Sequence, residues 1–564
     1  MQNIRIELML QDLHSLMIDS ASLSIQERRD SVRRWLEPVF TDSVYEFALR
    51  LRHDSTCDWI VNTPCFRDWL TEKEKASKML WIYGPPGFGK TVLCARIIHH
   101  LKSDLGGEVV YFFCSAEDQA RQHVLQILKS CIAQLIGQNQ TALEAIFMED
   151  YLRQRIEELR QPTRSELWKA LKYIVTNLSN CFIVIDGFDE CSPTNDGPKY
   201  HNQDARSQFL AELIQNLKNT GVRVLLISRD YSDIREELTK ESDETKSWTI
   251  FKHGITKEDN AEDISSFSKS LFEKKLPKMN EELRTEMADR ASTKSEGMFL
   301  WLHLLNDEIK RGATKRQLDR LLSEMPRGID EAYQRELDRI LDTSTRKDAR
   351  DRAIAILRWV LFAVRPLTVR ELAEALAVTF DNSDSEYPED DLPDWSEDGA
   401  AEDYINENIR KPCGSLIEIL EQEQGSSLDS HTVRFVHFSV KEFLLKPLEN
   451  GQVRSDTLRF QPDTEEHDAL AIVCLRYLCY PVFNTLSTGN VDDDDQTLNY
   501  PFLAYAASNW YTHALYGQKV SKNVSIYTRN LFNPSVSNWL TWAKLYEAND
   551  SFLSEIAVDE EDKG

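Results

Sequence analysis

The stretch MLWIYGPPGFGKTVLCARIIHHL, residues 79–101, decides the fold. Its first five residues form a continuous apolar run, which is typical of a strand buried on both faces, and residues 92–101 indicate a helix. Between them, residues 84–91 fit the pattern G-x-x-x-x-G-K-[ST]. A glycine-rich turn between a buried strand and a helix N-terminus directs several backbone N–H groups at one point. The stretch therefore predicts a phosphate-binding loop.

We expect this loop to hold the phosphates of a nucleotide. Lys90 would place a cation against the β- and γ-phosphates, and Thr91 would give its hydroxyl to Mg²⁺. The alternative is a glycine-rich turn with a coincidental lysine, and the flanking strand and helix argue against it. The residues predicted to bind the nucleotide are Gly84, Pro85, Pro86, Gly87, Phe88, Gly89, Lys90, Thr91 and Val92.

Three further apolar runs, residues 109–114, 181–186 and 222–228, alternate with amphipathic helical patterns. One of these helices opens with Thr163 and Glu166 at the spacing of a capping box. Buried strands that alternate with helices predict an α/β domain with a doubly wound, mostly parallel sheet.

Charged residues follow two of these runs. Asp186 ends the run CFIVID, so its carboxylate lies at the C-terminal edge of the sheet, where it can hold Mg²⁺ directly or through water. Asp189 or Glu190 could orient or deprotonate an attacking water, and the sequence does not choose between them. Each could also be a solvated loop acid. Arg229 follows the run 222–228 and could sense a γ-phosphate, with a surface salt bridge as the alternative.

From about residue 255 the pattern becomes helical. Residues 353–364 followed by RPLTVRELAEALAV predict a helix–turn–helix whose second helix begins near Val369. Two short runs, 415–420 and 432–438, are candidate strands of a small wing, so this part is interpreted as a winged-helix domain. We interpret the acidic tract 381–403 as a solvated, partly disordered insertion, and the acidic runs 492–495 and 558–562 likewise.

These patterns predict five consecutive regions. The fold class is an α/β domain followed by a helical domain, a winged-helix domain and a C-terminal helical segment. The expected boundaries are an N-terminal helical segment at 1–50, a nucleotide-binding domain at 51–250, a helical domain at 251–340, a winged-helix domain at 341–450 and a C-terminal helical region at 451–564.

Composition argues against several functions. The 564 residues include 67 Lys and Arg and 93 Asp and Glu, a formal net charge of −26. Such a chain is a poor candidate for binding nucleic acids or anionic membranes, and its candidate recognition helix has only two arginines nearby, Arg365 and Arg370.

No run reaches the ~20 apolar residues of a membrane span, and the first residues lack the cleavage site of a secretory signal. Cysteines inside apolar runs favour free thiols in a reducing, cytoplasmic compartment.

Together these motifs resemble the NACHT branch of the STAND class of P-loop NTPases, the signal-transduction ATPases with numerous domains. Within this branch they resemble fungal NOD-like-receptor proteins with a nephrocystin-3-like nucleotide-binding region. The resemblance is carried by GPPGFGKT, by Gly187 with the acidic pair that follows it, and by the segments EGMFLWLHLL, EMPRGIDEAYQREL, RWVLFAVRPLTVREL and VRFVHFSVKEFLL. It covers about residues 25–515.

The resemblance implies a switch that binds ATP or ADP with Mg²⁺, hydrolyses slowly and self-associates on activation, with GTP left open as the nucleotide. Partner proteins would supply sensor or effector functions. His437 occupies the position of a winged-helix histidine that relatives place near the β-phosphate, and a structural histidine is the alternative. Phe299 stands where relatives carry the proline of a G-x-P motif that touches adenine, so this chain departs from the pattern there.

Two rival interpretations remain at this point. The first is an interaction scaffold in which the nucleotide joins the domains without useful hydrolysis. The second and weaker one is a conventional P-loop kinase or motor, for which no acceptor site is recognisable.

Relatives carry an effector domain before the ATPase and repeats after it. The short ends of this chain predict a minimal member, a truncated product, or a switch whose sensor and effector act in trans.

Overall fold

The computed structural model describes residues 25–71, 77–178, 180–192, 205–240, 248–326, 328–342, 347–380, 387–395, 400–420, 431–446, 460, 464–483, 499–517, 521–535 and 537–549. The chain divides into two compact units, Met1–Leu302 and His303–Gly564. Residues 1–24 of the predicted N-terminal helical segment lie outside the described residues, as do the acidic runs 492–495 and 558–562.

The first unit is built on a parallel five-stranded sheet of order β2-β3-β4-β1-β5. Its strands are β1 (Ser77–Tyr83), β2 (Glu108–Phe113), β3 (Cys181–Asp186), β4 (Arg223–Ser228) and β5 (Trp248–Gly254). The four strands predicted from apolar runs are confirmed. The edge strand β5 was not predicted, because only Trp248 among its seven residues is buried and no apolar run marks it.

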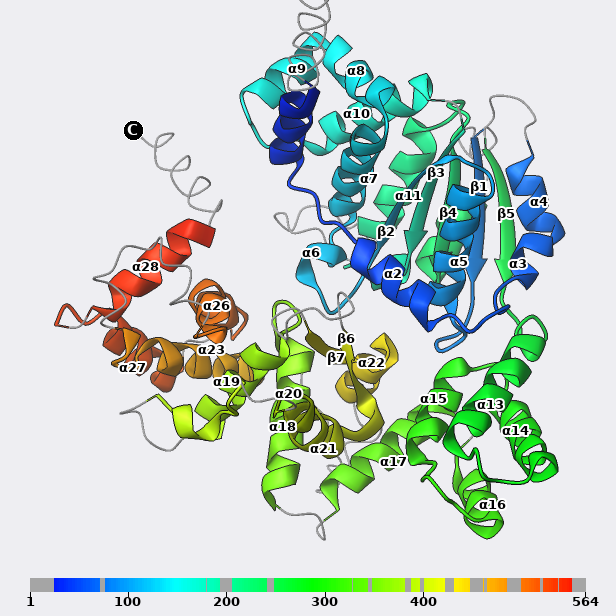
Figure 1. Cartoon of the computed structure of the whole chain (residues 1–564). Coiled ribbons are helices and arrows are strands. Elements are labelled where there is room, and N and C mark those ends of the chain that lie inside the picture. Colours follow the sequence, from blue (N-terminus) through cyan, green and yellow to red (C-terminus); the bar gives the residue numbers. More distant parts are fainter. Residues whose placement is uncertain are drawn as a thin grey trace, which may run out of the picture. The chain divides into compact units, whose positions relative to one another are not determined.

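Helices cover both faces of this sheet (Figure 1). Residues 25–36 are helical. The other helices are α2 (Asp42–Leu51), α3 (Trp59–Asn62), α4 (Pro64–Leu70), α5 (Lys90–Ser103), α6 (Gln119–Gln122), α7 (Val124–Gln138), α8 (Gln140–Met148), α9 (Asp150–Glu157), α10 (Arg164–Asn177), η1 (Phe188–Glu190), α11 (Ala205–Asn216), α12 (Ser232–Thr239), α13 (Ala261–Lys275), α14 (Glu281–Ser295) and α15 (Phe299–Glu308).

The two hydrophobic cores follow from the two-residue period of the strands. In β1, Met79 and Trp81 join the core formed with α7, α10 and α11. Leu80 and Ile82 point the other way, into the core formed with α4 and α5. Because both faces are covered, the strands read as continuous apolar runs. The predicted capping box at Thr163 and Glu166 opens α10.

The second unit contains the predicted winged helix. The helix α19 begins at Val369, and Thr368 caps it by accepting a hydrogen bond from the Glu371 N–H at 3.2 Å. The wing strands β6 and β7 pair antiparallel. The elements of this unit are α16 (Lys315–Glu324), α17 (Ile329–Leu341), α18 (Lys347–Phe362), α19 (Val369–Phe380), η3 (Glu389–Asp391), α20 (Ala400–Tyr404), the π-helix η4 (Ile405–Arg410), α21 (Lys411–Cys413), η5 (Gly414–Leu416), β6 (Ile417–Leu420), β7 (Thr432–Phe435), α22 (Phe438–Leu445), α23 (Thr464–Leu478), α26 (Phe502–Tyr516), α27 (Lys522–Leu531) and α28 (Asn538–Asn549).

In the described part of the acidic tract 381–403, the acids at 389–391 and 394 are exposed, as expected of a solvated insertion, whereas Tyr387 is half-buried. Its hydroxyl donates to Glu374 Oε1 at 2.7 Å, and its ring packs edge-on against Tyr477 and Tyr500. One aromatic residue therefore anchors this acidic segment to the helices that follow the winged helix. Among the described residues, no helix is both long and apolar enough to cross a membrane.

Candidate functional site

The phosphate loop connects β1 to α5, as its sequence predicts. Gly87 and Gly89 have φ angles of 78° and 76°, in the left-handed region that favours glycine. The ammonium of Lys90 folds back over the loop and donates to the carbonyl oxygens of Gly84 at 3.0 Å and Pro85 at 2.7 Å. The lysine therefore already lies against the loop and could exchange these carbonyls for stronger anionic acceptors.

Asp186 lies beside the start of α5. It ends β3, which β4 separates from β1, and its side chain shares a hydrogen bond with Thr91. Burial raises the pKa of Asp186 to about 6, although the Thr91 hydrogen bond and the charge of Lys90 both favour its ionised form. A hydroxyl and a carboxylate in contact are the oxygen donors that Mg²⁺ prefers, so these two residues fit a magnesium site.

Asp189 and Arg229 form an ion pair, although the sequence analysis treated them separately. Asp189 Oδ1 accepts a hydrogen bond from the Arg229 backbone N–H at 3.0 Å, and Oδ2 lies 3.4 Å from the guanidinium Nε. Both side chains are largely buried, with 3% and 14% of their surface exposed. The pair joins the end of β4 to the turn η1, which begins after Gly187 at a φ of 65°.

Glu190 differs from Asp189 in its surroundings. Its Oε2 accepts a hydrogen bond from the Ala116 backbone N–H at 3.2 Å. Burial, reinforced by repulsion from Asp189, raises the pKa of Glu190 to about 8. Burial also lowers the pKa of Lys90 to about 8, against the opposing effect of Asp189. A buried cluster of acids and bases with shifted pKa values is typical of a functional site.

The phosphate loop is tied to the helical segment that follows the sheet, which the sequence did not reveal. Asn260 is buried, and its amide donates to the carbonyl oxygens of Phe88 at 3.2 Å and Gly297 at 3.1 Å. The Leu300 N–H donates to the Gly87 carbonyl at 3.3 Å. The ring of Phe299 lies against Gly89, since a Cβ at Gly89 would approach it to 3.2 Å. Phe299 therefore contacts the loop itself.

Changing Asn260 to Ala should destabilise the first unit by about 1–3 kcal/mol, because two buried carbonyls would lose their donor. Asn260→Asp should cost more, since a carboxylate would face the same carbonyls. The measurement is chemical denaturation of the full chain. Asn177→Ala, at an exposed position that ends α10, is the control and should stay within about 0.5 kcal/mol of the wild type. Equal effects of Asn260→Ala and the control would contradict the bridging role.

A cavity of about 390 Å³ adjoins the first half of the loop. Its lining comes from the loop and from the segments that follow β4 and β5. The lining residues are Tyr83, Gly84, Pro85, Pro86, Arg229, Asp230, Tyr231, Gly254 and Ile255. The sequence analysis did not name Asp230, Tyr231, Gly254 and Ile255 of this set. Their position could have indicated them, because they lie at or just after the C-terminal ends of parallel strands, where ligands bind in open α/β sheets.

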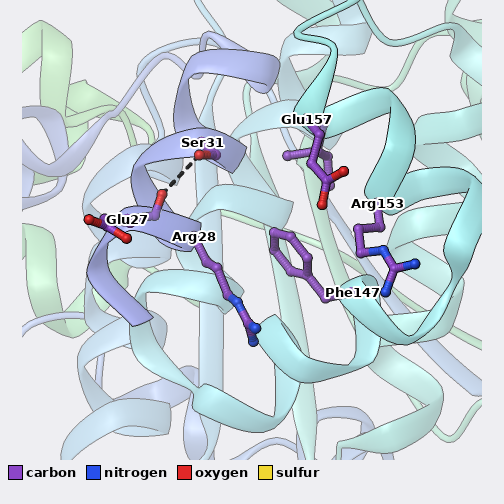
Figure 2. A pocket seen from close by; sticks show the side chains of 7 residues that line it. Glu27, Arg28, Ser31, Phe147, Arg153 and Glu157 are labelled. Carbon is purple, nitrogen blue, oxygen red and sulfur yellow. Dashed lines mark hydrogen bonds between the residues drawn. The ribbon is translucent and has the colours of Figure 1, made fainter. Parts of the chain in front are cut away.

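A second hollow of about 500 Å³ lies between the helix at 25–36 and the α8–α9 region (Figure 2). Arg28 lies over the ring of Phe147 at 5.5 Å, and Arg153 pairs with Asp150 at 2.8 Å. The Ser31 hydroxyl donates to the Glu27 carbonyl at 2.9 Å. None of these residues belongs to the phosphate-site motifs.

His437 has a structural task within the second unit. It is the N-cap of α22, and its Nδ1 accepts a hydrogen bond from the Ser439 backbone N–H at 3.1 Å. The Ser439 hydroxyl in turn lies 2.9 Å from the Tyr333 hydroxyl. A contact between His437 and a nucleotide stays a prediction.

Two protein families match separate parts of the chain. The family described as "Nephrocystin 3, N-terminal" matches residues 55–229, which include the loop, Asp186 and Arg229. Residues 55–229 are therefore similar to the nephrocystin-3 N-terminal family, and their parallel sheet and phosphate loop have the fold of a P-loop NTPase. The family "GPI inositol-deacylase, winged helix domain" matches residues 340–456, so a winged-helix domain follows this nephrocystin-3-type domain.

Two fungal proteins are similar in sequence. The vegetative incompatibility protein HET-E-1 of Podospora anserina is 28% identical over 411 residues, which are 70% of this chain and 26% of that protein. The azaphilone pigments biosynthesis cluster protein L of Monascus ruber is 29% identical over 231 residues, which are 41% of this chain and 44% of that protein. The chain thus spans less than half the length of either relative.

Solved structures were also compared. A Walker-type ATPase of Pyrococcus abyssi matches with a TM-score of 0.32 and 14% identity, over 70% of this chain and 97% of that one. The ORC2 protein of Aeropyrum pernix matches with a TM-score of 0.28 and 12% identity, over 64% of this chain and 84% of that one.

Proposed function

We propose that the chain is an ATP/ADP-dependent molecular switch of the NACHT class, which binds Mg-nucleotide, hydrolyses it slowly and thereby controls oligomerisation in signalling. The observation that carries this proposal is the contact between Thr91 and Asp186 at the start of α5. It joins a loop hydroxyl and a strand-end carboxylate where the phosphate loop ends, which is the donor pair that a magnesium–nucleotide complex requires.

Each residue of the cluster has a proposed role. The loop amides and Lys90 bind the phosphates, and Thr91 and Asp186 hold Mg²⁺, which neutralises phosphate charge when bound. Both carboxylate oxygens of Asp189 already face Arg229, so we assign this pair to sensing the γ-phosphate. Glu190 is then the candidate to orient the attacking water.

The wider role rests on weaker support. The relative named for vegetative incompatibility supports a part in fungal self/non-self signalling. We also propose self-association on activation, protein partners that supply sensor and effector functions, and the five regions and boundaries given above. A cytoplasmic location is supported by the cysteines, since eight of the ten are buried free thiols.

The nucleotide that co-purifies with the protein tests this function. We expect about one ADP per wild-type chain, because a slow switch retains its product. Glu190→Gln should retain ATP instead, since the glutamine keeps an acceptor for the Ala116 N–H but cannot take a proton from water. Glu144→Gln, on the exposed face of α8, is the matched control and should carry ADP. The readout is chromatography of the nucleotide released by denaturation.

The same experiment addresses the scaffold alternative. That alternative is favoured by one observation, the full engagement of Asp189 by Arg229, which leaves a single acid for water. A scaffold would carry the same nucleotide in the wild type and in Glu190→Gln. Protein that is folded but free of nucleotide, and that does not take up added Mg-ATP, would refute both interpretations.

A further inference from the structure

A row of hydrogen bonds connects three segments of the second unit. The Val364 backbone N–H, in the turn between α18 and α19, lies 3.0 Å from the Tyr505 hydroxyl oxygen. The same oxygen lies 2.9 Å from His513 Nε2, and both residues belong to α26. On the other side of this ring, His513 Nδ1 lies 3.0 Å from Nδ1 of His467, which is on α23. The row therefore joins the α18–α19 turn to α26 and α23.

The Val364 N–H fixes the direction of the whole row. A backbone N–H can only donate, so the Tyr505 oxygen accepts from it and offers its own proton to His513 Nε2. A neutral imidazole carries one N–H, which places the proton of His513 on Nδ1, where it is donated to His467 Nδ1. The proton of His467 is then on Nε2. Each link holds one proton, and both imidazoles are neutral.

An additional proton has no place in this row. The two nitrogens that could take it, His513 Nε2 and His467 Nδ1, each already accept a hydrogen bond. A proton on either nitrogen would set two donors against each other and break that link. His513 is fully buried, and burial, reinforced by the neighbouring His467, lowers the pKa of His513 to about 3. Burial also lowers the pKa of His467.

His467 is the imidazole that solvent can reach. It is half-buried, and its ring packs against those of Phe362 and Tyr516, with ring centres 5.4 Å and 5.1 Å away. The other imidazole, His513, is covered by Trp359, which lies edge-on at 6.5 Å between ring centres. A proton from solvent therefore enters the row at His467.

The charged groups around the imidazoles do not stabilise a positive charge there. Lys441 of α22 lowers the pKa of His467 further. On α23 itself, Glu466 is paired with Arg358, and Asp468 Oδ1 lies next to the C-cap of α26. Within the described part of the chain, no carboxylate acts on the pKa of either imidazole.

The groups at the tyrosine end also leave the row uncharged. The Arg365 guanidinium lies over the Tyr505 ring at 5.2 Å and is paired with Glu371 at 2.7 Å. Burial raises the pKa values of Tyr505 and Cys474, so both stay protonated. Burial also raises the pKa of Glu374, which contacts α23 and α26. Glu374 therefore opposes a loss of stability in acid.

We propose that this row is a pH-sensitive latch, which joins α23 and α26 to the α18–α19 turn while both imidazoles are neutral and opens when the pair takes up a proton. The latch lies in the second unit and does not depend on nucleotide. When the segments open, both histidines bind protons below about pH 6.5, whereas the closed row does not. The stability that the latch contributes is therefore complete above this pH and is lost as the pH falls below it.

Hydrogen exchange of the full chain at pH 7 and pH 5 tests the latch. The measured quantity is the protection factor of each peptide, the ratio of its unfolded exchange rate to its folded rate at the same pH. In peptides from α23 and α26, we expect this factor to fall about tenfold or more between pH 7 and pH 5, even against the opposing effect of Glu374. Peptides from α7, which holds no part of the row, should change much less.

Variants separate the latch from a general sensitivity to acid. In His467→Gln the amide oxygen can accept from the His513 N–H but takes up no proton, so the fall in protection should become about fivefold smaller. His431→Gln, the control, removes an imidazole of the second unit that is not in the row and should behave as the wild type. Should His467→Gln misfold, the wild-type comparison with α7 decides alone. Equal falls in the α23, α26 and α7 peptides of the wild type, or an unchanged fall in folded His467→Gln, would overturn the proposal.

Discussion

Lys90→Ala should weaken binding of Mg-ADP and Mg-ATP by about 100-fold or more. The ammonium now lies on the loop carbonyls of Gly84 and Pro85, within a partly buried cluster. Removing one partner of a buried, hydrogen-bonded charge pair costs about 2–5 kcal/mol, and each 1.4 kcal/mol is tenfold in affinity. Residues 84–91 contain no second lysine that could replace Lys90 against the phosphate oxygens.

Calorimetric titration of nucleotide-free protein measures this change. Lys90→Arg retains the charge and should recover only part of the affinity, because a planar guanidinium does not fit where a compact ammonium lies. Lys172→Ala, at an exposed position on α10, removes one lysine elsewhere and should bind as the wild type does. Equal affinities of Lys90→Ala and Lys172→Ala would mean that the loop does not hold phosphate.

Glu374→Ala should destabilise the second unit by about 3–5 kcal/mol. Only 3% of Glu374 is exposed, and its carboxylate accepts three hydrogen bonds. The donors are the Tyr477 hydroxyl at 2.6 Å, the Tyr387 hydroxyl at 2.7 Å and the Phe502 N–H at 3.0 Å. Alanine would leave these donors without an acceptor, at a cost of about 1–3 kcal/mol for each buried group that finds no water.

Hydrogen exchange of peptides from α19, α23 and α26 localises this loss, and urea denaturation gives its size. Glu374→Gln keeps one acceptor oxygen and should lose about 1–2 kcal/mol. Glu389→Ala removes an exposed acid from the acidic tract 381–403, which also contains Tyr387, and should change stability little. If Glu374→Ala exchanged no faster than Glu389→Ala, the carboxylate would not join these helices.

The predictable part of the fold is the part with a strong local pattern. Four strands buried on both faces appear as apolar runs. The helix α10 appears through its cap at Thr163, and α19 appears through the helix–turn–helix pattern that places its start near Val369. The strand β5 was not predicted, because an edge strand is half-solvated. It carries the polar residues Lys252 and His253 and therefore shows no apolar run. The packing of Tyr387 could not be predicted, because a single aromatic residue in an acidic tract carries no sequence signal for its partners.

The site divides in the same way. The loop and the acids could be named in advance, because phosphate and magnesium chemistry demand particular residues at fixed spacing. The Asp189–Arg229 pair could not, since its members are 40 residues apart and meet only through strand order. Asn260 lies in no motif. Its partners Phe88 and Gly297 come from other segments, so only the three-dimensional arrangement reveals its role.

The position of β1 within the sheet has a consequence for biosynthesis. Its neighbours are β4 and β5, which begin at residues 223 and 248, whereas β1 ends at residue 83. The strand that leads into the phosphate loop therefore has no lateral partner until the ribosome has passed residue 228, and it lacks the second partner until residue 254. Such distant parallel pairing slows folding and leaves apolar edges open meanwhile. The newborn chain should accordingly depend on chaperones during that interval.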